Sequence, residues 1–348
     1  MPIQSLLPAL AFGILFTTTA LSQPGADSPR LAAPIVLETM TVSGEQPGPG
    51  LWRVSKGTHV LWIVGTQTPV PQKMTWRAKG IEAIVAQSQE VLSAPSMSVS
   101  MKQIGWFTAL TMLPSALQAR KNPDDAMLKD IVPAELHARW VVLRDKYIDS
   151  YNINDEEKNI EGWRPMFAAL ELYRKAINKS GLTSASPVWP VIRDAAKKHN
   201  VKITDLKFEP VINEPRAALK EMRSTRLADI ECFERTVERI ETDLAAMRVR
   251  ANAWARGDVE AIRKLPATDQ RAACEAAVRN ASFMKKLGAE NAIAQMEALW
   301  LNAAESALKN HTVALAVLPI AQIVSKDGYV AKLRARGYAV EEPDAGTD

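Results

Sequence analysis

Residues 51–76 constrain the fold of this chain more than any other stretch. The runs LWRVS and THVLWIVG lie on either side of Lys56-Gly57, a two-residue turn whose glycine allows a positive φ, and they predict a β-hairpin. Residues 60–64 are all apolar, which is typical of a central strand with both faces covered. The predicted register pairs Val54 with His59, Arg53 with Val60 and Trp52 with Leu61.

The second strand of this hairpin ends in a polar tetrad made of Gly65, Thr66, Gln67 and Thr68. Pro69 and Pro71 follow, and they prevent the chain from continuing within the sheet. Open α/β sheets place their ligand sites in loops that follow central strands, so the tetrad is a candidate binding site. The alternative interpretation is a proline-rich turn without chemistry.

The N-terminus predicts export. Residues 6–21 are apolar and uncharged, and a polar break begins at Ser22, which is the pattern of a secretory signal peptide cleaved near that residue. We expect a signal peptide over residues 1–22, a tether over 23–47 with a short strand at 35–42, and a periplasmic or secreted protein without a stable membrane span. A signal retained as a membrane anchor is the alternative, although the apolar run is short for a span.

The chain contains two cysteines, Cys232 and Cys274. In an exported protein an even number of cysteines predicts a disulfide. This bond would close a loop of about 40 residues and stabilise the fold by roughly 3–4 kcal/mol. Two buried thiols in neighbouring helices are the alternative.

The charge of the chain argues against one class of partner. The 43 basic and 39 acidic residues give a net charge of +4, and they are spread evenly along the sequence. A nucleic-acid-binding surface needs a dense basic patch, commonly interleaved with aromatic residues, and no stretch has this composition. We therefore expect a protein or peptide ligand and no nucleic acid.

Apolar periodicity divides the chain into sheet-forming ends and a helical middle at about 98–310. Outside the hairpin we expect a helix at 77–88, strands at 90–92, 312–320 and 338–341, and a helix at 327–336. The middle is helical with breaks at Pro114, Pro123, Pro133 and Pro165, and it includes a helix at 187–198 and a strand at 201–206. The predicted fold is α/β (α+β): a central mixed sheet built from N- and C-terminal parts, flanked by helices, in a single domain over 48–348 with a large helical insertion.

Residues 223–254 form the longest helical pattern. Apolar side chains recur at spacings of three and four, at Leu227, Ile230, Phe233, Val237, Ile240, Leu244, Met247, Ala251 and Trp254. We expect one long helix that packs within the domain and ends near Gly257. A coiled-coil dimer is the alternative.

No widely shared catalytic motif occurs in the sequence. The patterns G-x-S-x-G, P-loop, C-x-x-C and H-E-x-x-H are all missing from it. The histidines are too far apart in sequence to form a local metal site; they are His59, His137, His199 and His311. Most acidic residues fall beside Lys or Arg on predicted helix surfaces, so general acids or bases do not stand out.

Three separated segments resemble the TraB/GumN family, which is similar to the Tiki metalloproteases. LWRVSKGTHVLWIVGTQTPVP resembles the family's first motif, a hairpin that ends in Gly-x-x-His. AAMRVRANAWARGDVEAIRKL is similar to its helical A-W-x-x-G-D segment. TVALAVLPIAQIVSKDGYVAKLRARGYAVEE resembles its last motif, a strand with a second Gly-x-x-His, followed by Asp-Gly and a helix. The resemblance covers about residues 51–342.

The resemblance implies a divalent-metal site, and this sequence departs from it at each ligand position. Thr68 and Gln322 stand where the two motifs have their histidines, and Pro319 stands at the glycine position of the last motif. The family's glutamate, just after the strand at 90–92, aligns with Ala94. Hydroxyl, amide and methyl groups are poor replacements for imidazole and carboxylate ligands, so we expect the metal site to be lost.

Three functions follow as expectations. The first is a non-catalytic family member, a pseudoenzyme that serves as an envelope or periplasmic binding or accessory module without a cofactor. Its vestigial pocket would comprise Gly65, Thr66, Gln67, Thr68, Trp76 and Gln322. The second is a metal-dependent hydrolase of peptide or ester bonds with altered ligands, in which Glu90 is the general base and His59 a displaced ligand. The third is a helical structural or interaction protein built on the stripe at 223–254.

Overall fold

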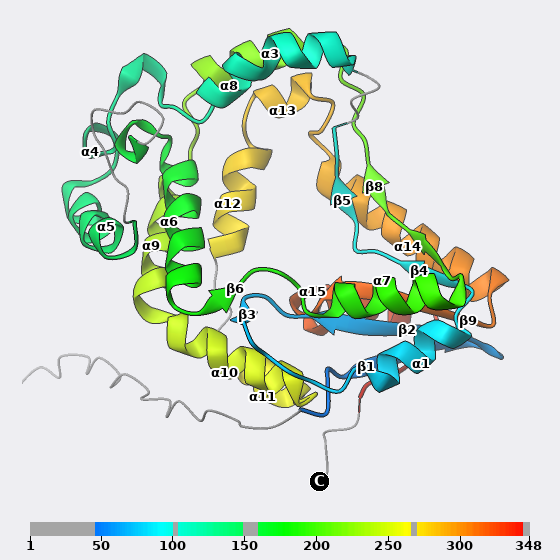
Figure 1. Cartoon of the computed structure of the whole chain (residues 1–348). Helices are drawn as coiled ribbons and strands as arrows, with labels where there is room; N and C mark the ends of the chain where they lie inside the picture. Colours follow the sequence, from blue (N-terminus) through cyan, green and yellow to red (C-terminus); the bar gives the residue numbers. More distant parts are fainter. Residues whose placement is uncertain (1–45, 100–103, 149–158, 266–269, 344–348) are drawn as a thin grey trace, which may run out of the picture. The chain divides into compact units, whose positions relative to one another are not determined.

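The computed structural model describes residues 46–99, 104–148, 159–265 and 270–343 (Figure 1). The predicted signal peptide, the strand expected at 35–42 and nearly all of the predicted tether lie outside these ranges. Within the described ranges, none of the helices combines the length and the apolar character that crossing a bilayer requires.

A six-stranded mixed sheet, in the order β10-β1-β2-β9-β4-β7, forms the centre of the fold. Its strands are β1 (Leu51–Lys56), β2 (His59–Thr66), β4 (Glu90–Leu92), β7 (Lys202–Thr204), β9 (Val313–Pro319) and β10 (Ala339–Glu341). Neighbours from β2 to β7 pair in parallel, whereas β1 pairs antiparallel with both β2 and β10. This confirms the predicted mixed sheet, in which both ends of the chain take part.

The central strands are buried because apolar side chains occupy both of their faces. Every residue of β9 from Ala314 to Leu318 is at most 1% exposed. In Figure 1, α1 (Lys79–Gln87) and α7 (Val188–His199) lie in front of the sheet, and α14 (Ala292–Asn310) lies behind it. Two C-terminal helices, α15 (Ile320–Val324) and α16 (Tyr329–Ala335), complete this layer.

The hairpin forms as predicted, but its register differs from the predicted one. β1 pairs with β2 so that Lys56 faces His59 and Val54 faces Leu61, which leaves Gly57 and Thr58 in the turn. Gly57 has a φ of 61°, and Thr58 is not among the residues with positive φ. A type II′ turn has this pattern and favours glycine at its first central position, whereas the prediction placed it second. The three predicted pairs, Val54–His59, Arg53–Val60 and Trp52–Leu61, are therefore wrong.

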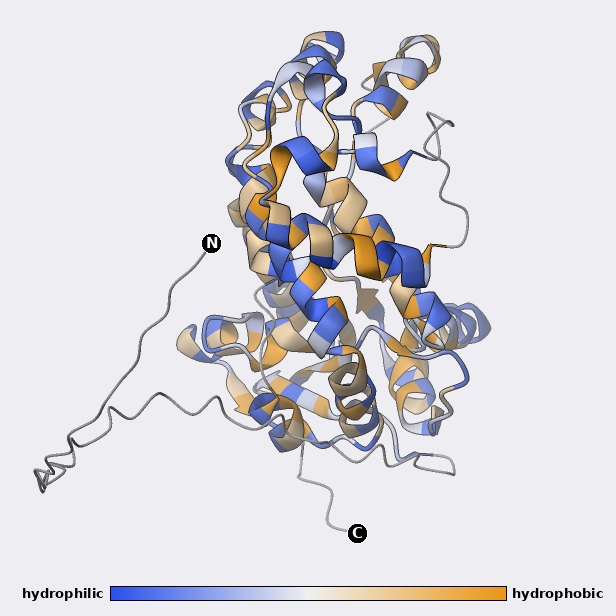
Figure 2. Cartoon of the chain, turned by 90° about the vertical axis from the view of Figure 1, so that its left-hand side faces the viewer, coloured by the Kyte–Doolittle hydropathy of each residue, from blue (hydrophilic) through white to orange (hydrophobic). Residues whose placement is uncertain are grey.

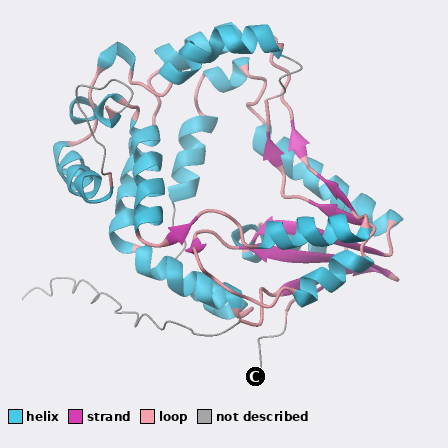
Figure 3. Ribbon diagram, viewed as in Figure 1, coloured by secondary structure: helices cyan, strands magenta, loops and turns pink. Residues whose placement is uncertain are grey.

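The middle of the chain is helical, as predicted (Figure 3). Its helices are α3 (Trp106–Gln118), α4 (Leu128–Ile131), α5 (Ala134–Tyr147), α6 (Pro165–Lys179), α8 (Pro215–Ser224), α9 (Ile230–Thr242), α10 (Leu244–Ala255), α11 (Val259–Lys264), α12 (Gln270–Arg279) and α13 (Phe283–Lys286). Pro114 does not break the chain here but lies inside α3. This helix is exposed, so solvent can satisfy the carbonyl that the proline leaves without a donor. Figure 2 shows apolar and polar residues mixed along these helices, which is typical of amphipathic packing.

The single helix predicted over 223–254 is wrong, because α8, α9 and α10 share this range and α9 meets α10 at Asp243. The Asp243 carboxylate lies 3.5 Å from both Arg239 Nε and Arg250 Nη1, so it joins residues on either side of the bend. The apolar spacing continues across the bend and gave no sign of it. Phe233 and Ile240 of α9 pack in a cluster with residues of α5 and α6.

Two short strand pairs connect the sheet with the helical region. β3 (Val70–Pro71) pairs antiparallel with β6 (Leu182–Thr183), directly after the polar tetrad. β5 (Ser96–Met97) pairs in parallel with β8 (Lys207–Phe208), after the end of β4. Both pairs therefore leave the sheet from the edge at which β2 and β4 end.

Candidate functional site

The two tetrads that the sequence singles out lie side by side at one edge of the sheet. Thr66 pairs with Pro319, so β2 and β9 end together. Leu92 pairs with Ala316 on the other side of β9, which brings the loop after β4 to the same edge. Three positions at which the resemblance implies metal ligands therefore converge at the C-terminal edge of the parallel strands, the usual ligand-binding edge of such sheets. They are Thr68, Ala94 and Gln322.

The side chains at these three positions do not suit a metal ion. Thr68 offers a neutral hydroxyl and Ala94 a methyl group, and Gln322 offers an amide whose Oε1 atom is buried without a hydrogen-bond partner among the described residues. Divalent metals in such sites prefer imidazole and carboxylate ligands. Within the described ranges, no cluster of three or more His, Cys, Asp or Glu residues could hold a metal. The residues present therefore do not fit the ion that the resemblance implies.

Trp254 supports the first tetrad through a buried hydrogen bond. Its indole Nε1 donates a hydrogen bond of 2.7 Å to the carbonyl oxygen of Gly65, and both groups are buried. Trp76 packs edge-on against Trp254 with ring centroids 6.0 Å apart. The sequence suggests Trp76 as a pocket residue, and the structure places it in the hydrophobic core, where it is 9% exposed.

Thr66 and Gln67 are tied to the main chain and leave Thr68 as the exposed member of the tetrad. Thr66 Oγ1 donates to the carbonyl oxygen of Leu318 at 3.4 Å. Gln67 is buried, and its Nε2 donates to the carbonyl oxygen of Thr68 at 3.2 Å. The polar groups of the tetrad thus support the loop and do not point toward a common ligand.

Thr68 and Pro69 border a groove of about 590 Å³, which we call the methionine groove. Its apolar walls come from β5, α6, α12, α13 and α14 and consist of Met97, Met166, Leu170, Tyr173, Val278, Met284, Ile293 and Met296. Methionine side chains are flexible and polarizable, so such walls adapt to apolar ligands of varied shape. Sequence reasoning missed this groove, because its residues come from five separated elements.

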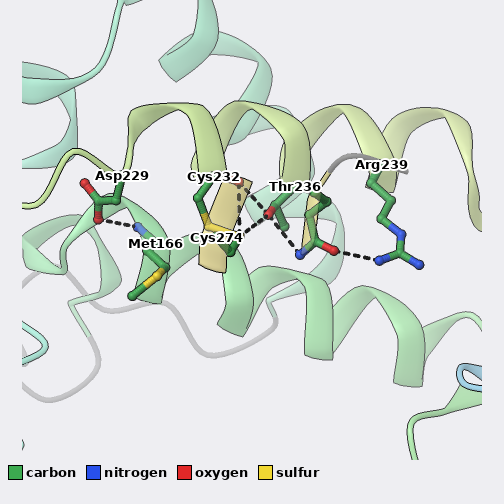
Figure 4. The surroundings of a disulfide bond; sticks show 7 residues. Met166, Asp229, Cys232, Thr236, Arg239 and Cys274 are labelled. Atoms are coloured by element: carbon green, nitrogen blue, oxygen red, sulfur yellow. Dashed lines mark hydrogen bonds between the residues drawn. A yellow bond between two sulfur atoms is a disulfide. The ribbon is translucent and has the colours of Figure 1, made fainter. Parts of the chain in front are cut away.

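Charged side chains around the methionine groove are engaged with one another. Arg271 Nε donates to Glu275 Oε1 at 2.7 Å. Arg239 Nη1 donates to Gln270 Oε1 at 2.6 Å, and Gln270 Nε2 donates to Thr236 Oγ1 at 3.2 Å (Figure 4). These contacts hold Arg239, Arg271 and Glu275 in place; Arg279 and Glu290 also border the groove, whose remaining walls are mainly apolar.

A disulfide between Cys232 of α9 and Cys274 of α12 forms part of the groove wall (Figure 4). This confirms the predicted bond and rules out the alternative of two free thiols. Because Cys274 lines the groove, the disulfide fixes α12 against α9 in this part of the groove wall.

Gln322 lines a second cavity of about 380 Å³ next to the groove. The wall between the two hollows carries Arg271, Glu275 and Ile293, which border both. Gly328 of the Asp-Gly motif passes so close that a Cβ atom there would lie 2.1 Å from the carbonyl oxygen of Gln322. This close approach requires glycine.

The phenol of Tyr329 also lines this second cavity. Burial, followed by the nearby Glu297 carboxylate, raises the pKa of Tyr329 to about 12. The Tyr329 hydroxyl is therefore neutral at physiological pH.

Glu90 and His59, the residues expected under the hydrolase alternative, lie at the opposite edge of the sheet. Glu90 pairs with Ala314, five positions before Pro319 on β9, and His59 is the first residue of β2. At about 3.3 Å per residue, Glu90 is roughly 16 Å from the tetrads along the strand. The strands that precede Thr68, Ala94 and Gln322 thus end at the same edge of the sheet, where Thr68 and Gln322 line separate cavities, whereas Glu90 and His59 lie at the opposite edge.

The Glu90 carboxylate connects strands. It accepts hydrogen bonds from Thr204 Oγ1 and Lys202 Nζ, and it lies 3.3 Å from His311 Nε2. Burial acts to raise the pKa of Glu90, but the bonds from Thr204 and Lys202 and the charges of Lys202 and His311 outweigh it and lower that pKa. An ionised carboxylate held by these partners stabilises the edge formed by β4 and β7.

The model of the TraB/PrgY/gumN family matches residues 50–342. The chain belongs to this family. No curated protein and no solved structure matches the chain. Within the TraB/PrgY/gumN fold, the A-W-x-x-G-D segment now has a structural role: Trp254 supports the tetrad, and Asp258 accepts a hydrogen bond of 2.8 Å from the Ala261 N–H at the start of α11. The A-W-x-x-G-D segment could be recognised in the sequence through the family resemblance. Its contact between Trp254 and Gly65 could not.

Proposed function

We propose that this TraB/PrgY/gumN family protein is a non-catalytic binding module that holds an extended apolar polypeptide segment in the methionine groove. One observation carries the proposal: Thr68, at one of the three positions where the resemblance implies a metal ligand, offers only a hydroxyl group and borders an apolar groove. A hydrolytic site at this edge would need groups that bind a metal or transfer protons. The side chains of Thr68, Ala94 and Gln322 can contact a bound ligand, but they supply neither a preferred metal ligand nor a group for proton transfer.

The β5 strand supports a polypeptide as the ligand. The N–H groups of Ser96 and Ser98 donate to the carbonyl oxygens of Leu206 and Phe208, both at 2.9 Å. Because alternate residues of a strand direct their main-chain groups to opposite sides, Met97 presents its N–H and C=O at the other edge of β5. Among the described strands, β5 pairs with β8 alone. An extended peptide that adds to this edge would place alternate side chains in the groove that Met97 lines.

Export from the cytoplasm is part of the proposal. The disulfide between Cys232 and Cys274 supports it, because such bonds persist in oxidising compartments. The apolar segment at residues 6–21 supports it from the sequence side. An N-terminal residue determination on protein expressed with its own leader tests this part separately.

The binding proposal is tested with an immobilised library of ten-residue peptides, probed with the purified full chain. We expect peptides rich in Leu, Ile, Val and Met to bind, and Ile293→Asp to weaken this binding at least tenfold, because a carboxylate in an apolar groove is costly. Met97→Pro should also weaken it by removing the N–H at the strand edge. Val142→Asp is the matched control, since Val142 is 67% exposed and lies outside the groove.

Two outcomes would overturn the binding proposal. Equal binding by the wild type and the Ile293→Asp protein would place the ligand elsewhere. Cleavage of the bound peptides that a chelator abolishes would instead support the metal-dependent peptidase.

A further inference from the structure

Helix α3 carries a broad apolar face that no described element covers. Trp106, Phe107, Leu110, Leu113 and Leu117 are between 51% and 66% exposed. No residue of this helix is buried. Single exposed apolar residues are ordinary, but five on one helix form a contiguous patch that indicates a binding surface.

The apolar face points away from the rest of the protein. At 3.6 residues per turn, the five side chains fall within an arc of about 120°. Thr111, Met112 and Ser115 lie on the opposite side of α3, where they line a small hollow shared with α8. Arg216 of α8 donates a hydrogen bond of 2.9 Å to Thr111 Oγ1 across this contact. In Figure 1, α3 and α8 lie together at the top of the helical region.

A cationic stripe on α8 borders the hollow between α8 and this uncharged helix. Residues 105–119 contain no charged side chain. Arg216, Lys220 and Arg223 follow one another at spacings of four and three, so they share one face of α8, and all three are exposed. Ala218, on the opposite face of the helix, is buried.

The stripe continues into a polar hollow of about 540 Å³ at the C-terminal end of α3. Lys121, Lys220, Arg223 and Arg226 line it together with Asp124 and Asp125. Arg226 lies 3.8 Å from Asp124. Lys220, Arg223 and Arg226 outnumber the two carboxylates, so this hollow at the C-terminal end of α3 has an excess of positive charge.

A buried arginine fixes both helices to the rest of the chain. Arg164 is 1% exposed, and its Nε donates to the carbonyl oxygen of Ala119 just after α3. The same guanidinium donates to the carbonyl oxygens of Met222, Arg223 and Thr225 at the end of α8. The apolar face and the cationic stripe are therefore held in a fixed relation.

We propose that α3 docks flat on an anionic membrane surface, with its apolar side chains among the acyl chains and the cations of α8 facing the lipid phosphates. Tryptophan and phenylalanine favour the membrane interface, and an amphipathic helix with adjacent basic residues binds there. The 13 residues of α3 are too few to span a bilayer of roughly 30 Å. Charge complementarity selects an anionic bilayer over an apolar protein partner, since a protein groove for the five side chains gives the neighbouring cationic stripe no counterpart.

The test is flotation of the full chain with vesicles of phosphatidylcholine alone or mixed with phosphatidylglycerol. We expect the wild type to bind the anionic vesicles and Leu110→Glu/Leu113→Glu to bind at least tenfold more weakly. Lys220→Gln/Arg223→Gln should lose about tenfold on anionic vesicles and change little on neutral ones. The matched control is Val142→Glu/Val211→Glu, at two residues 67% and 66% exposed, which should bind as the wild type does.

All four proteins share the N-terminal apolar segment, so differences in vesicle binding between them report on the substituted residues of α3 and α8. The substituted leucines are exposed, and unchanged thermal unfolding will confirm that the variants fold. Equal vesicle binding by the wild type and the Leu110→Glu/Leu113→Glu protein would overturn the proposal. A wild type that ignores vesicles but dimerises through these leucines in sedimentation velocity would also overturn it, in favour of a second copy.

Discussion

The two edges of the central sheet carry opposite chemistry. At the N-terminal edge of the parallel strands, Glu90 accepts hydrogen bonds from Thr204 and Lys202 and lies beside His311. At the C-terminal edge, Thr68, Ala94 and Gln322 are uncharged; Thr68 borders the methionine groove, and Gln322 lines the neighbouring cavity. The ionisable groups of the sheet thus join strands at one edge, and the other edge offers contact surface.

This difference shows that the geometry of the strand ends and the chemistry of the side chains placed there can be considered separately. Trp254 still supports the Gly65 carbonyl, and Gly328 still makes room for the Gln322 carbonyl. Main-chain carbonyls near the groove therefore fix the conformation of the loops after β2 and β9. At the opposite end of the strands, the Glu90 carboxylate stabilises the fold through its charged hydrogen bonds. Four variants test this comparison, and they are given in order of decreasing change in stability.

The disulfide should give the largest effect. Cys232→Ser/Cys274→Ser removes a crosslink between residues 42 apart, which should lower the free energy of unfolding by about 4 kcal/mol on the chain-entropy estimate. Urea denaturation at pH 7 measures it. The wild type in reducing buffer should show the same loss, and an unchanged midpoint in both cases would contradict a stabilising role of this bond in the groove wall.

Trp254→Phe should lower the free energy of unfolding by about 2 kcal/mol, because the Gly65 carbonyl loses its buried donor and a small cavity remains. Trp106→Phe is the matched control, since Trp106 is 65% exposed, and it should change stability by less than about 0.5 kcal/mol. Chemical denaturation compares the two proteins. Equal effects would show that the tetrad does not depend on this hydrogen bond.

Glu90→Gln should lower the free energy of unfolding by about 1.5 kcal/mol at pH 7, the range for hydrogen bonds to a charged group. The pKa of Glu90 is lowered in the folded protein, so its ionised form stabilises the fold above its unfolded pKa. That contribution disappears as the pH falls through the folded pKa, and wild type and variant should converge in acid. Thermal unfolding between pH 7 and pH 3 measures this stability difference between the wild type and the variant. Glu82→Gln, at an exposed site on α1, should show no such convergence.

Gln322→Leu should have the smallest effect and should stabilise the fold by up to about 1 kcal/mol, because the buried Oε1 has no partner among the described residues. Gln67→Leu provides the contrast. It removes a bond to the Thr68 carbonyl from a buried side chain, so it should destabilise by about 1 kcal/mol. Destabilisation by Gln322→Leu as well would indicate that Gln322 has a partner this account lacks.

Local pattern predicted the sheet well. The apolar runs of β2 and β9 could be located, because strands covered on both faces have few polar residues. The hairpin register failed at the turn, where one glycine fits two turn types that differ by one position. The bend at Asp243 could not be seen, because the apolar spacing of α9 continues into α10 and only the arginines that meet Asp243 in space distinguish the break.

The candidate site was predictable in its location and not in its surroundings. The resemblance placed Thr68 and Gln322 at one edge, and the strand register brings their strands together there. The methionine groove could not be predicted, since Met97, Met166, Met284 and Met296 come from different elements. The uncharged stretch of α3 was visible in the sequence, but its exposure depends on how α8 covers the opposite side.

Metal binding tests the central claim most directly. The full chain is dialysed against Mn²⁺, Co²⁺ or Zn²⁺, and the bound metal per chain is measured together with thermal unfolding before and after a chelator. We expect far less than one ion per chain and an unchanged unfolding temperature, because Thr68, Ala94 and Gln322 supply no ligand that suits these ions. Near-stoichiometric metal whose removal lowers the unfolding temperature would contradict it.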